Sequence, residues 1–331
     1  ATEAGASTQP TTDQRALVPT AVAMHDVLDE APAMLDRPAR LIGEHAYVAT
    51  WVWQRSGAGS SLAILRNDGA LFSRSLSGCQ PMENLGVRVA LPHAPSPPDV
   101  LSGAGLKRFG AGEKPDAAAT FRRVVDVVNR CVGFRRSLDD HAVMCELIAT
   151  YVLSSYTLDA FDVIGYLWPN GIKGSGKSRL LSTITELACL GSTTLSSGTF
   201  PALRDLAAYG ACLGFDEAET LMDLKRIDPE KRALALAGNR RGITVPVKER
   251  TPEKEWVTKH VNAFCPRVFG AINLPDEVLG SRCIVIPMTM TNGDYPDPSD
   301  HDEWPHNRGQ LIDDLWLTAL IHLPRMKVIN R

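Results

Sequence analysis

The segment that most constrains the fold is residues 171–178, which read GIKGSGKS and match the pattern G-x-x-x-x-G-K-[ST] at every fixed position. A short apolar run, 163–168 (VIGYLW), precedes this segment and is ended by Pro169-Asn170. The residues that follow, RLLSTITELACL, carry apolar side chains at the spacing of a helix with one buried face. The order strand, glycine-rich loop and helix predicts a phosphate-binding loop.

Each residue type in this loop has a chemical reason. Glycines allow the backbone to wrap closely around an anion with its N–H groups pointing inward, and the following helix N-terminus also favours phosphate. We expect Lys177 to reach the β- and γ-phosphates of ATP and the Ser178 hydroxyl to bind Mg²⁺. The predicted nucleotide-binding set is Gly171, Lys173, Gly174, Ser175, Gly176, Lys177 and Ser178. The alternative is a glycine-rich turn that matches the pattern by accident.

Composition limits the function classes only weakly. The 331 residues are enough for about two domains, and the net charge of −3 indicates no global basic field, so any DNA contact would be local, for example inside a pore. The seven cysteines include no C-x-x-C pair, which favours reduced core residues over a zinc site or disulfides. No apolar run approaches the ~18 residues of a membrane span. We therefore expect a cytoplasmic protein without membrane contact.

Shifts in composition divide the chain into segments. In order, we expect a flexible lead-in (1–20), a small α+β domain (21–100), a linker (101–119), a helical collar or buttress (120–158), an α/β core (159–290) and a loop with a final amphipathic helix (291–331). The lead-in lacks the features of a signal peptide and an initiator Met, so the chain could be cut from a longer protein.

The segment 21–100 has mixed patterns. We expect a helix over 21–35, a strand over 46–53 and a hairpin over 62–76 around Asn67-Asp68-Gly69. Trp51 and Trp53 alternate with Val52, which is more typical of a core or an interface than of a base-stacking platform. This unit carries no catalytic constellation that the sequence identifies.

From 159 onward, strand and helix patterns alternate, which predicts a parallel α/β sheet. The expected strands are 163–168, 192–196, 211–215, 267–273 and 283–288. The predicted fold class is therefore α/β, with a five-stranded, mainly parallel sheet and helices on both faces, preceded by a helical segment and a small β-rich unit.

Polar residues at strand ends suggest catalysis. Asp216 and Glu217 follow an apolar strand about 40 residues after Lys177, as expected of an acidic pair that binds Mg²⁺ through water and orients the attacking water. Alone, the pair could simply begin a helix. Asn273 ends the next apolar strand and could hold the attacking water near the γ-phosphate, although an ordinary Asn-Leu-Pro turn is the alternative.

An arginine completes the predicted catalytic set. Arg282 precedes the last strand, from which it could reach the γ-phosphate of a neighbouring subunit and stabilise charge in the transition state. An ordinary surface arginine is the alternative, and Arg267 is a second, weaker candidate. The catalytic set is Lys177, Asp216, Glu217, Asn273 and Arg282.

The series GIKGSGKS, CLGFDE, GNRRGITVPVK, RVFGAIN and LPDEVLGSRC resembles the AAA+ P-loop NTPase core of superfamily 3 helicases, in particular the primase-helicase branch of phages and plasmids. The resemblance covers about residues 155–290. It implies that Lys177, Ser178, Asp216 and Glu217 bind and hydrolyse Mg-ATP. It also implies that Asn273 is the sensor and that Arg282 acts across the interface of a homo-oligomeric ring, expected to be a hexamer.

The same resemblance gives a meaning to residues 239–260, because a β-hairpin at this place in the family carries basic residues onto DNA. Two strand-like arms, 243–247 and 256–261, flank a charged tip. The expected DNA-binding residues are Arg240, Arg241, Lys248, Arg250, Lys254 and Lys259, with His260 as a further candidate. Glu249, Glu253 and Glu255 dilute the positive charge, so a solvated hairpin is the alternative.

The sequence thus predicts a ring ATPase that acts as a DNA helicase or translocase in replication. Its expected cofactors are ATP and Mg²⁺, and its expected partners are single-stranded or forked DNA and a primase or other replication protein. The rival reading is an ATP-driven oligomeric switch or scaffold that binds proteins without unwinding; a small-molecule kinase is a weaker one. No primase signature is present upstream. The acidic and histidine residues of 297–306 lack rigid spacing, so no metal site is expected there.

Overall fold

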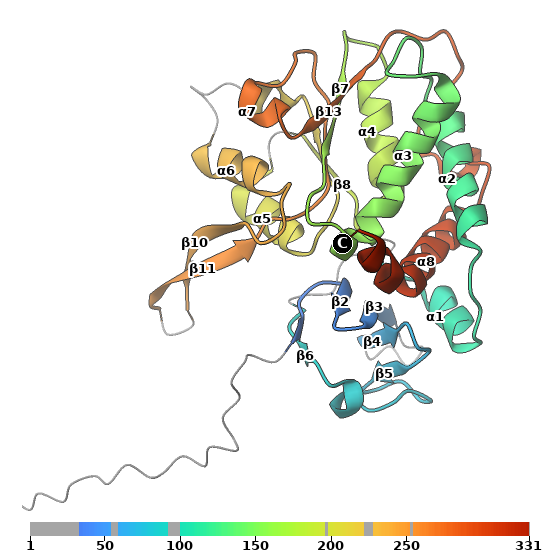
Figure 1. Ribbon diagram of the computed structural model, residues 1–331, viewed down its shortest axis with the longest axis vertical. Coiled ribbons are helices and arrows are strands. Elements are labelled where there is room, and N and C mark those ends of the chain that lie inside the picture. The colour runs from blue at the N-terminus through green and yellow to red at the C-terminus, as the bar shows by residue number, and fades with distance from the viewer. Residues whose placement is uncertain are drawn as a thin grey trace, which may run out of the picture. The chain divides into compact units, whose positions relative to one another are not determined.

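The computed structural model describes residues 33–53, 59–91, 100–195, 198–221, 228–251 and 254–330, and Figure 1 shows its elements. These elements belong to one compact unit, Met34–Arg331. The lead-in over 1–20 and most of the helix expected over 21–35 lie outside the described residues. The end of that expected helix is wrong, because β1 (Met34–Leu35) pairs in parallel with β6 (Arg88–Val89) and buries Leu35 completely.

The β-rich N-terminal part forms a four-stranded antiparallel sheet. Its order is β2 (Ala39–Ile42), β3 (His45–Trp53), β4 (Ser60–Arg66) and β5 (Leu71–Ser73). The predicted hairpin is confirmed, since β4 and β5 pair around the turn 67–69, where Gly69 has a φ of +93°. A short 3-10 helix, η2 (Met82–Leu85), follows the sheet.

Three helices connect this sheet to the core. The expected linker contains a helix, α1 (Gly103–Gly110), which begins because the Ser102 hydroxyl accepts the N–H groups of its first turn. The predicted helical pair is confirmed as α2 (Ala117–Cys131) and α3 (His141–Tyr156), each capped by an aspartate. The 3-10 helix η3 (Leu158–Ala160) leads into the central sheet.

The central sheet confirms the predicted five parallel strands. They are β7 (Tyr166–Asn170), β8 (Ser192–Leu195), β9 (Leu213–Asp216), β12 (Arg267–Phe269) and β13 (Cys283–Pro287). Their spatial order is β13-β7-β12-β9-β8, and every neighbouring pair is parallel. This sheet is compatible with a P-loop NTPase-like core.

The first strand of the sheet is displaced from its expected position. β7 begins at Tyr166 and includes Pro169 and Asn170, because it pairs with β13 as far as Pro287. Val163 instead forms an isolated bridge with Arg240. The sequence placed the strand end at the proline, whereas pairing along β13 extends the strand by two residues.

Helices cover both faces of this sheet. Figure 1 shows α4 (Lys177–Leu187) and α3 on one side, with α5 (Phe200–Ala208) and α6 (Pro229–Ala237) on the other. A hairpin of β10 (Thr244–Arg250) and β11 (Trp256–Asn262) extends beside α5 and α6. The remaining short elements are η4 (Ala218–Leu221), α7 (Glu277–Gly280) and η5 (His301–Glu303).

The final helix, α8 (Arg308–Ile329), is not amphipathic as expected, because every residue from 311 to 320 is buried. It packs against β3, α1, α2 and α3. Two buried carboxylates hold it in place: Asp313 accepts hydrogen bonds from the Ser102 N–H (2.7 Å) and hydroxyl (2.6 Å). Asp314 forms ion pairs with Arg108 (2.8 Å) and Arg123 (2.6 Å). Pairing explains why carboxylates are tolerated here.

Candidate nucleotide-binding site

The candidate phosphate loop, residues 171–178, connects the carboxyl end of β7 to the first turn of α4. The predicted order of strand, loop and helix is therefore observed. Gly174 and Gly176 have φ values of +80° and +90°, a region that side-chain-bearing residues rarely adopt. Gly176 caps the N-terminus of α4. The two glycines are thus required by the backbone path itself.

A segment that the sequence did not single out lies against this loop. A Cβ atom at Gly171 would be 2.2 Å from the carbonyl oxygen of Met288, so no larger residue fits there. A Cβ at Gly174 would be 3.3 Å from the Met290 side chain. Met288 and Met290 follow β13, whose carboxyl end lies beside that of β7. One feature of the sequence indicates this contact: two strands that are expected to be parallel have their carboxyl ends at the same end of the sheet.

The polar groups of the loop differ in how far the chain itself engages them. The Lys177 ammonium donates to the carbonyl oxygens of Gly171 (2.7 Å) and Ile172 (2.9 Å). The Ser175 side chain is buried, and its hydroxyl has no hydrogen-bond partner among the described residues. Lys173 and Ser178 are exposed. An ammonium group, hydroxyls and a helix N-terminus are therefore gathered within one turn of chain.

The acidic pair lies at the same end of the sheet as the loop, where the strands have their carboxyl ends. Asp216 is the last residue of β9, which is separated from β7 only by β12. Its Oδ1 accepts the N–H of Glu217 (3.1 Å), and Glu217 turns away from the strand with a φ of +56°. Glu219, which the sequence did not identify, accepts the N–H of Ile272 with its carboxylate.

Asn273 also lies near this end of the sheet, but it does not end the strand as expected, because β12 ends at Phe269. Its carbonyl oxygen accepts the indole N–H of Trp168 (3.0 Å), and the Asn170 side chain donates to the carbonyl of Ile272 (2.7 Å). These bonds join the segment after β12 to the end of β7. The Asn273 side chain itself is exposed. The loop, Asp216 and Asn273 thus lie together at the carboxyl ends of the strands, as expected for a parallel sheet.

Arg282 lies at the opposite end of the sheet, where the strands β7 and β13 begin. Its carbonyl oxygen accepts the N–H of Tyr166, the first residue of β7 (2.9 Å), and its guanidinium donates to the carbonyl of Val278. The structure therefore does not bring Arg282 to the candidate phosphate loop of its own chain. The weaker candidate, Arg267, is wrong: its side chain is fully buried and donates to the Tyr166 hydroxyl (2.7 Å).

The hairpin expected to contact DNA is observed as β10 and β11, paired from Thr244–Asn262 to Arg250–Trp256. Lys248, Arg250, Lys254 and Lys259 are exposed along it, and so is Arg240 at its base. The hairpin therefore begins and ends close to the expected bounds.

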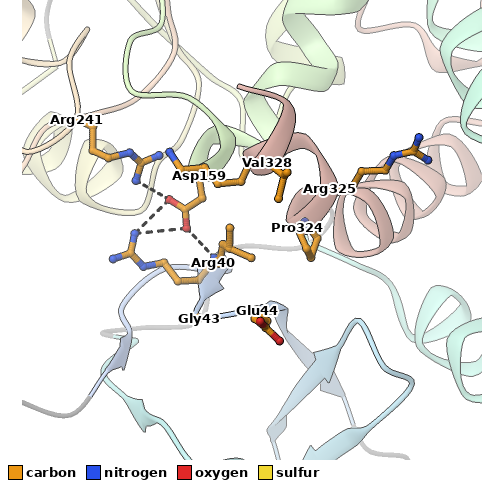
Figure 2. Close-up of a pocket in the computed structure, with 10 residues that line it drawn as sticks. Arg40, Gly43, Glu44, Asp159, Arg241, Pro324, Arg325 and Val328 are labelled. Atoms are coloured by element: carbon orange, nitrogen blue, oxygen red, sulfur yellow. Dashed lines mark hydrogen bonds and ion pairs between the residues drawn. The ribbon is translucent and has the colours of Figure 1, made fainter. Parts of the chain in front are cut away.

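Arg241 has different surroundings from the other basic residues. Its guanidinium donates to Asp159 (2.9 Å) and to the carbonyl oxygens of Leu158 (2.8 Å) and Phe161 (2.7 Å). Figure 2 shows this contact beside a cavity of about 770 Å³ that residues of β2 and α8 also line. Arg241 is thus engaged within the fold, at the foot of the hairpin.

Asp159 binds arginines from two parts of the chain. Besides Arg241, it forms ion pairs with Arg37 and Arg40 (3.2 Å), and it accepts the N–H of Leu41 (2.7 Å; Figure 2). Burial is the largest single influence and raises the pKa of Asp159, but Arg37, Arg40, the Leu41 N–H and Arg241 lower it, and the pKa lies below its ordinary value. The carboxylate is therefore charged at neutral pH.

The described residues also contain side chains of the types that bind metals. Among the residues that the structure describes, no three His, Cys, Asp or Glu side chains are placed to hold a metal ion. All seven cysteines are free thiols, and burial raises the pKa of Cys145 and Cys283 to about 12. Within the described ranges, no helix has the length and apolar character needed to cross a membrane.

Similarity to known proteins is found among solved structures. Neither a family model nor a curated protein matches the chain. Among solved structures, the A-form apo structure of the NrS-1 C-terminal region is similar over 84% of this chain, with 12% sequence identity and a TM-score of 0.33. The chain spans 65% of that structure, which is less than two thirds of its length. The family of the chain therefore stays a proposal.

Proposed function

We propose that this chain is an ATP-hydrolysing AAA+ motor that assembles into a homo-oligomeric ring, taken to be a hexamer, and acts as a superfamily 3-type DNA helicase or translocase. Replication of a phage, plasmid or mobile element is the proposed setting. One observation carries the proposal: the candidate phosphate loop joins β7 to α4 at the end of the sheet where β9 ends at Asp216 and where Asn273, in the segment after β12, accepts a hydrogen bond from Trp168.

The chemistry follows from the residue types at this edge. The Ser178 hydroxyl and the Asp216 carboxylate are oxygen ligands of the kind that Mg²⁺ prefers, and we propose that they hold it. Bound Mg²⁺ would neutralise phosphate charge. Lys177 would leave its loop carbonyls for the phosphates. Glu217 would orient the attacking water, and Asn273 would sense the γ-phosphate.

The nucleotide site is tested with Lys177→Ala. Loss of the ammonium group should lower ATP turnover on the order of 100-fold, because a positioned charge on the transferred phosphoryl group is removed. Lys114→Ala is the matched control, since Lys114 is exposed between α1 and α2 and removes the same charge. Equal turnover in the two variants would contradict the proposed nucleotide site.

The motor function is tested by ATP turnover with and without single-stranded DNA. DNA should stimulate turnover, and Lys248→Ala and Arg250→Ala should remove the stimulation while leaving basal turnover intact. No stimulation and no DNA binding at low salt, with basal turnover intact, would instead favour the oligomeric switch or scaffold.

A further inference from the structure

The cavity of about 770 Å³ beside Arg241 lies where β2, η3 and the last turns of α8 meet (Figure 2). Its volume falls within the range of roughly 300–1,000 Å³ that is usual for small-molecule sites. None of the described residues that line it belongs to the candidate nucleotide-binding site. The cavity is therefore a separate place where a ligand could be held.

The walls of the cavity carry more positive than negative side chains. Two carboxylates face four cations, which leaves an excess of two positive charges; these residues are Asp159 and Glu44, and Arg40, Arg241, Arg325 and Lys327. Behind the wall, Arg37 adds a further cation that is bonded to Asp159. The side chains of Asp36 and Asp162, 40% and 72% exposed, pair with Arg40 and Lys327. One positive charge remains after these three residues are counted, and solvent screens the two exposed carboxylates.

The cations also keep donors that the chain does not use. The Arg40 guanidinium bonds Asp159 through Nη1 (3.2 Å) and pairs with Asp36 through Nε (3.1 Å), so its Nη2 has no partner among the described residues. The Lys327 ammonium has three donors and gives one to Asp162 (2.9 Å).

The carboxylates of the wall do not supply the missing acceptors. Asp159 already accepts hydrogen bonds from three arginines and from the Leu41 N–H. Glu44 is exposed, and Figure 2 shows its carboxylate directed away from Arg40 and Arg241. Charged donors without acceptors are what an anion site presents to its ligand.

We infer that this cavity binds a nucleotide-sized small molecule through its phosphate group, with Arg40 Nη2 and Lys327 Nζ as the donors. A guanidinium presents its N–H groups in a planar fork that fits phosphate oxygens, and an ammonium adds a point charge. The apolar side chains of the wall, Leu41, Pro324 and Val328, would contact the body of the ligand. The bound molecule would join β2 to α8.

Binding is tested by isothermal titration calorimetry of the intact chain with adenosine monophosphate, adenosine and inorganic phosphate. EDTA is present, so that no Mg²⁺ supports binding at the candidate phosphate loop. Adenosine monophosphate should bind at least about tenfold more tightly than adenosine, which lacks the charge, and more tightly than inorganic phosphate, which lacks the body. The Lys177→Ala chain should bind it equally well, because Lys177 belongs to the other site.

A carboxylate placed in the cavity tests the charge requirement. Val328 lines the cavity and is 71% exposed, so the fold tolerates its replacement. Val328→Glu should weaken binding of adenosine monophosphate at least about tenfold, whereas Val328→Gln, of the same size without the charge, should change it less than about threefold.

The proposed ammonium contact is tested with Lys327→Ala, which should weaken binding about tenfold. Lys107→Ala is the matched control, since it removes an exposed lysine from the last turn of another helix, α1, and should leave the affinity unchanged.

Four outcomes would overturn the inference. Adenosine monophosphate could fail to bind at about 10 mM. Inorganic phosphate could bind as tightly as adenosine monophosphate, which would remove the nucleotide-sized ligand. Val328→Glu and Val328→Gln could weaken binding equally, which would remove the charge requirement. Lys177→Ala could abolish binding while Lys327→Ala leaves it unchanged, which would place the probe at the candidate phosphate loop. The proposed function is separate from these outcomes, since ATP turnover measures it without the probes.

Discussion

Arg267 carries a permanent charge in a fully buried position beside Gly238, where a Cβ would be 2.1 Å from its guanidinium. Its donors reach the Tyr166 hydroxyl and the carbonyl oxygens of Ala235 and Ala263 (both 3.0 Å). A buried charge is tolerated only when such partners surround it. The role of this arginine is therefore to join β12 to β7, to α6 and to the residue that follows β11.

Arg267→Ala should lower the free energy of unfolding by about 3 kcal/mol or more, because three buried acceptors lose their donor. Urea denaturation measures the effect. Arg130→Ala is the control, since Arg130 forms only a half-exposed ion pair with Glu303 and should cost under about 1 kcal/mol. Equal costs for the two variants would contradict the assigned role.

Asp159 gives a prediction that depends on pH. Its pKa is lowered in the folded chain, although burial raises it, because Arg37, Arg40, Arg241 and the Leu41 N–H all favour the charged carboxylate. The carboxylate therefore stabilises the fold above its ordinary pKa of about 3.9, and this contribution is lost as the pH falls through the lower folded value. Asp159→Asn should cost about 3 kcal/mol at pH 7.

The check is a series of urea denaturations of the intact chain and Asp159→Asn from pH 7 to the lowest pH at which both still fold. The difference in unfolding free energy should shrink below about pH 4. A difference that stays constant with pH would show that the network depends on shape and hydrogen bonds alone.

At the scale of elements, the loop from β7 to α4 is bounded by the segment after β13. Gly171→Ala would drive a Cβ into the Met288 carbonyl, so the loop backbone must shift. Nucleotide affinity should fall at least about tenfold, because a shift of the loop misplaces its N–H groups. Gly110→Ala, at the open end of α1, should leave affinity unchanged. Fluorescent-nucleotide titration of both variants measures this, and equal affinities would contradict it.

The elements themselves were largely predictable, whereas their exact bounds were not. Periodicity identified α2, α3 and all five strands of the central sheet, since each has one buried face or a short apolar run. It missed that α8 is buried on every side over residues 311–320, because Asp313 and Asp314 look like a solvated face until their partners are known. It also missed α1, whose glycines resembled a linker.

The candidate site shows a similar division. The glycine-rich motif and the polar residues expected after the strands correctly predicted that the loop, Asp216 and Asn273 lie close together, because parallel strands have their carboxyl ends at the same end of a sheet. The contacts of Met288 and Glu219 join segments that are distant in the sequence, so no local pattern indicates them.

At the scale of the whole molecule, Arg282 lies where the strands of the central sheet begin, and the candidate phosphate loop lies at the other end, where they finish. Under the proposed ring, each active site would take its loop from one chain and its arginine from the next. Lys177→Ala and Arg282→Ala should therefore both be inactive alone. Mixing them should restore part of the ATP turnover, because some interfaces then combine an intact loop with an intact arginine.

The mixture is measured at concentrations where the chains are assembled, against each variant alone at the same total concentration. The chain that carries both Lys177→Ala and Arg282→Ala is the control. Mixed with either single variant, it should restore no turnover, because no interface then combines an intact loop with an intact arginine. Unchanged turnover of Arg282→Ala by itself would contradict the shared site.

One carboxylate joins the foot of the hairpin to the small antiparallel sheet, since Asp159 binds Arg241 and also Arg40 and Leu41 of β2 (Figure 2). Side chains held by several charged hydrogen bonds resist displacement. Under the proposed motor function, a displacement of the hairpin would therefore be transmitted through Arg241 and Asp159 to β2, and the small antiparallel sheet would move together with the hairpin.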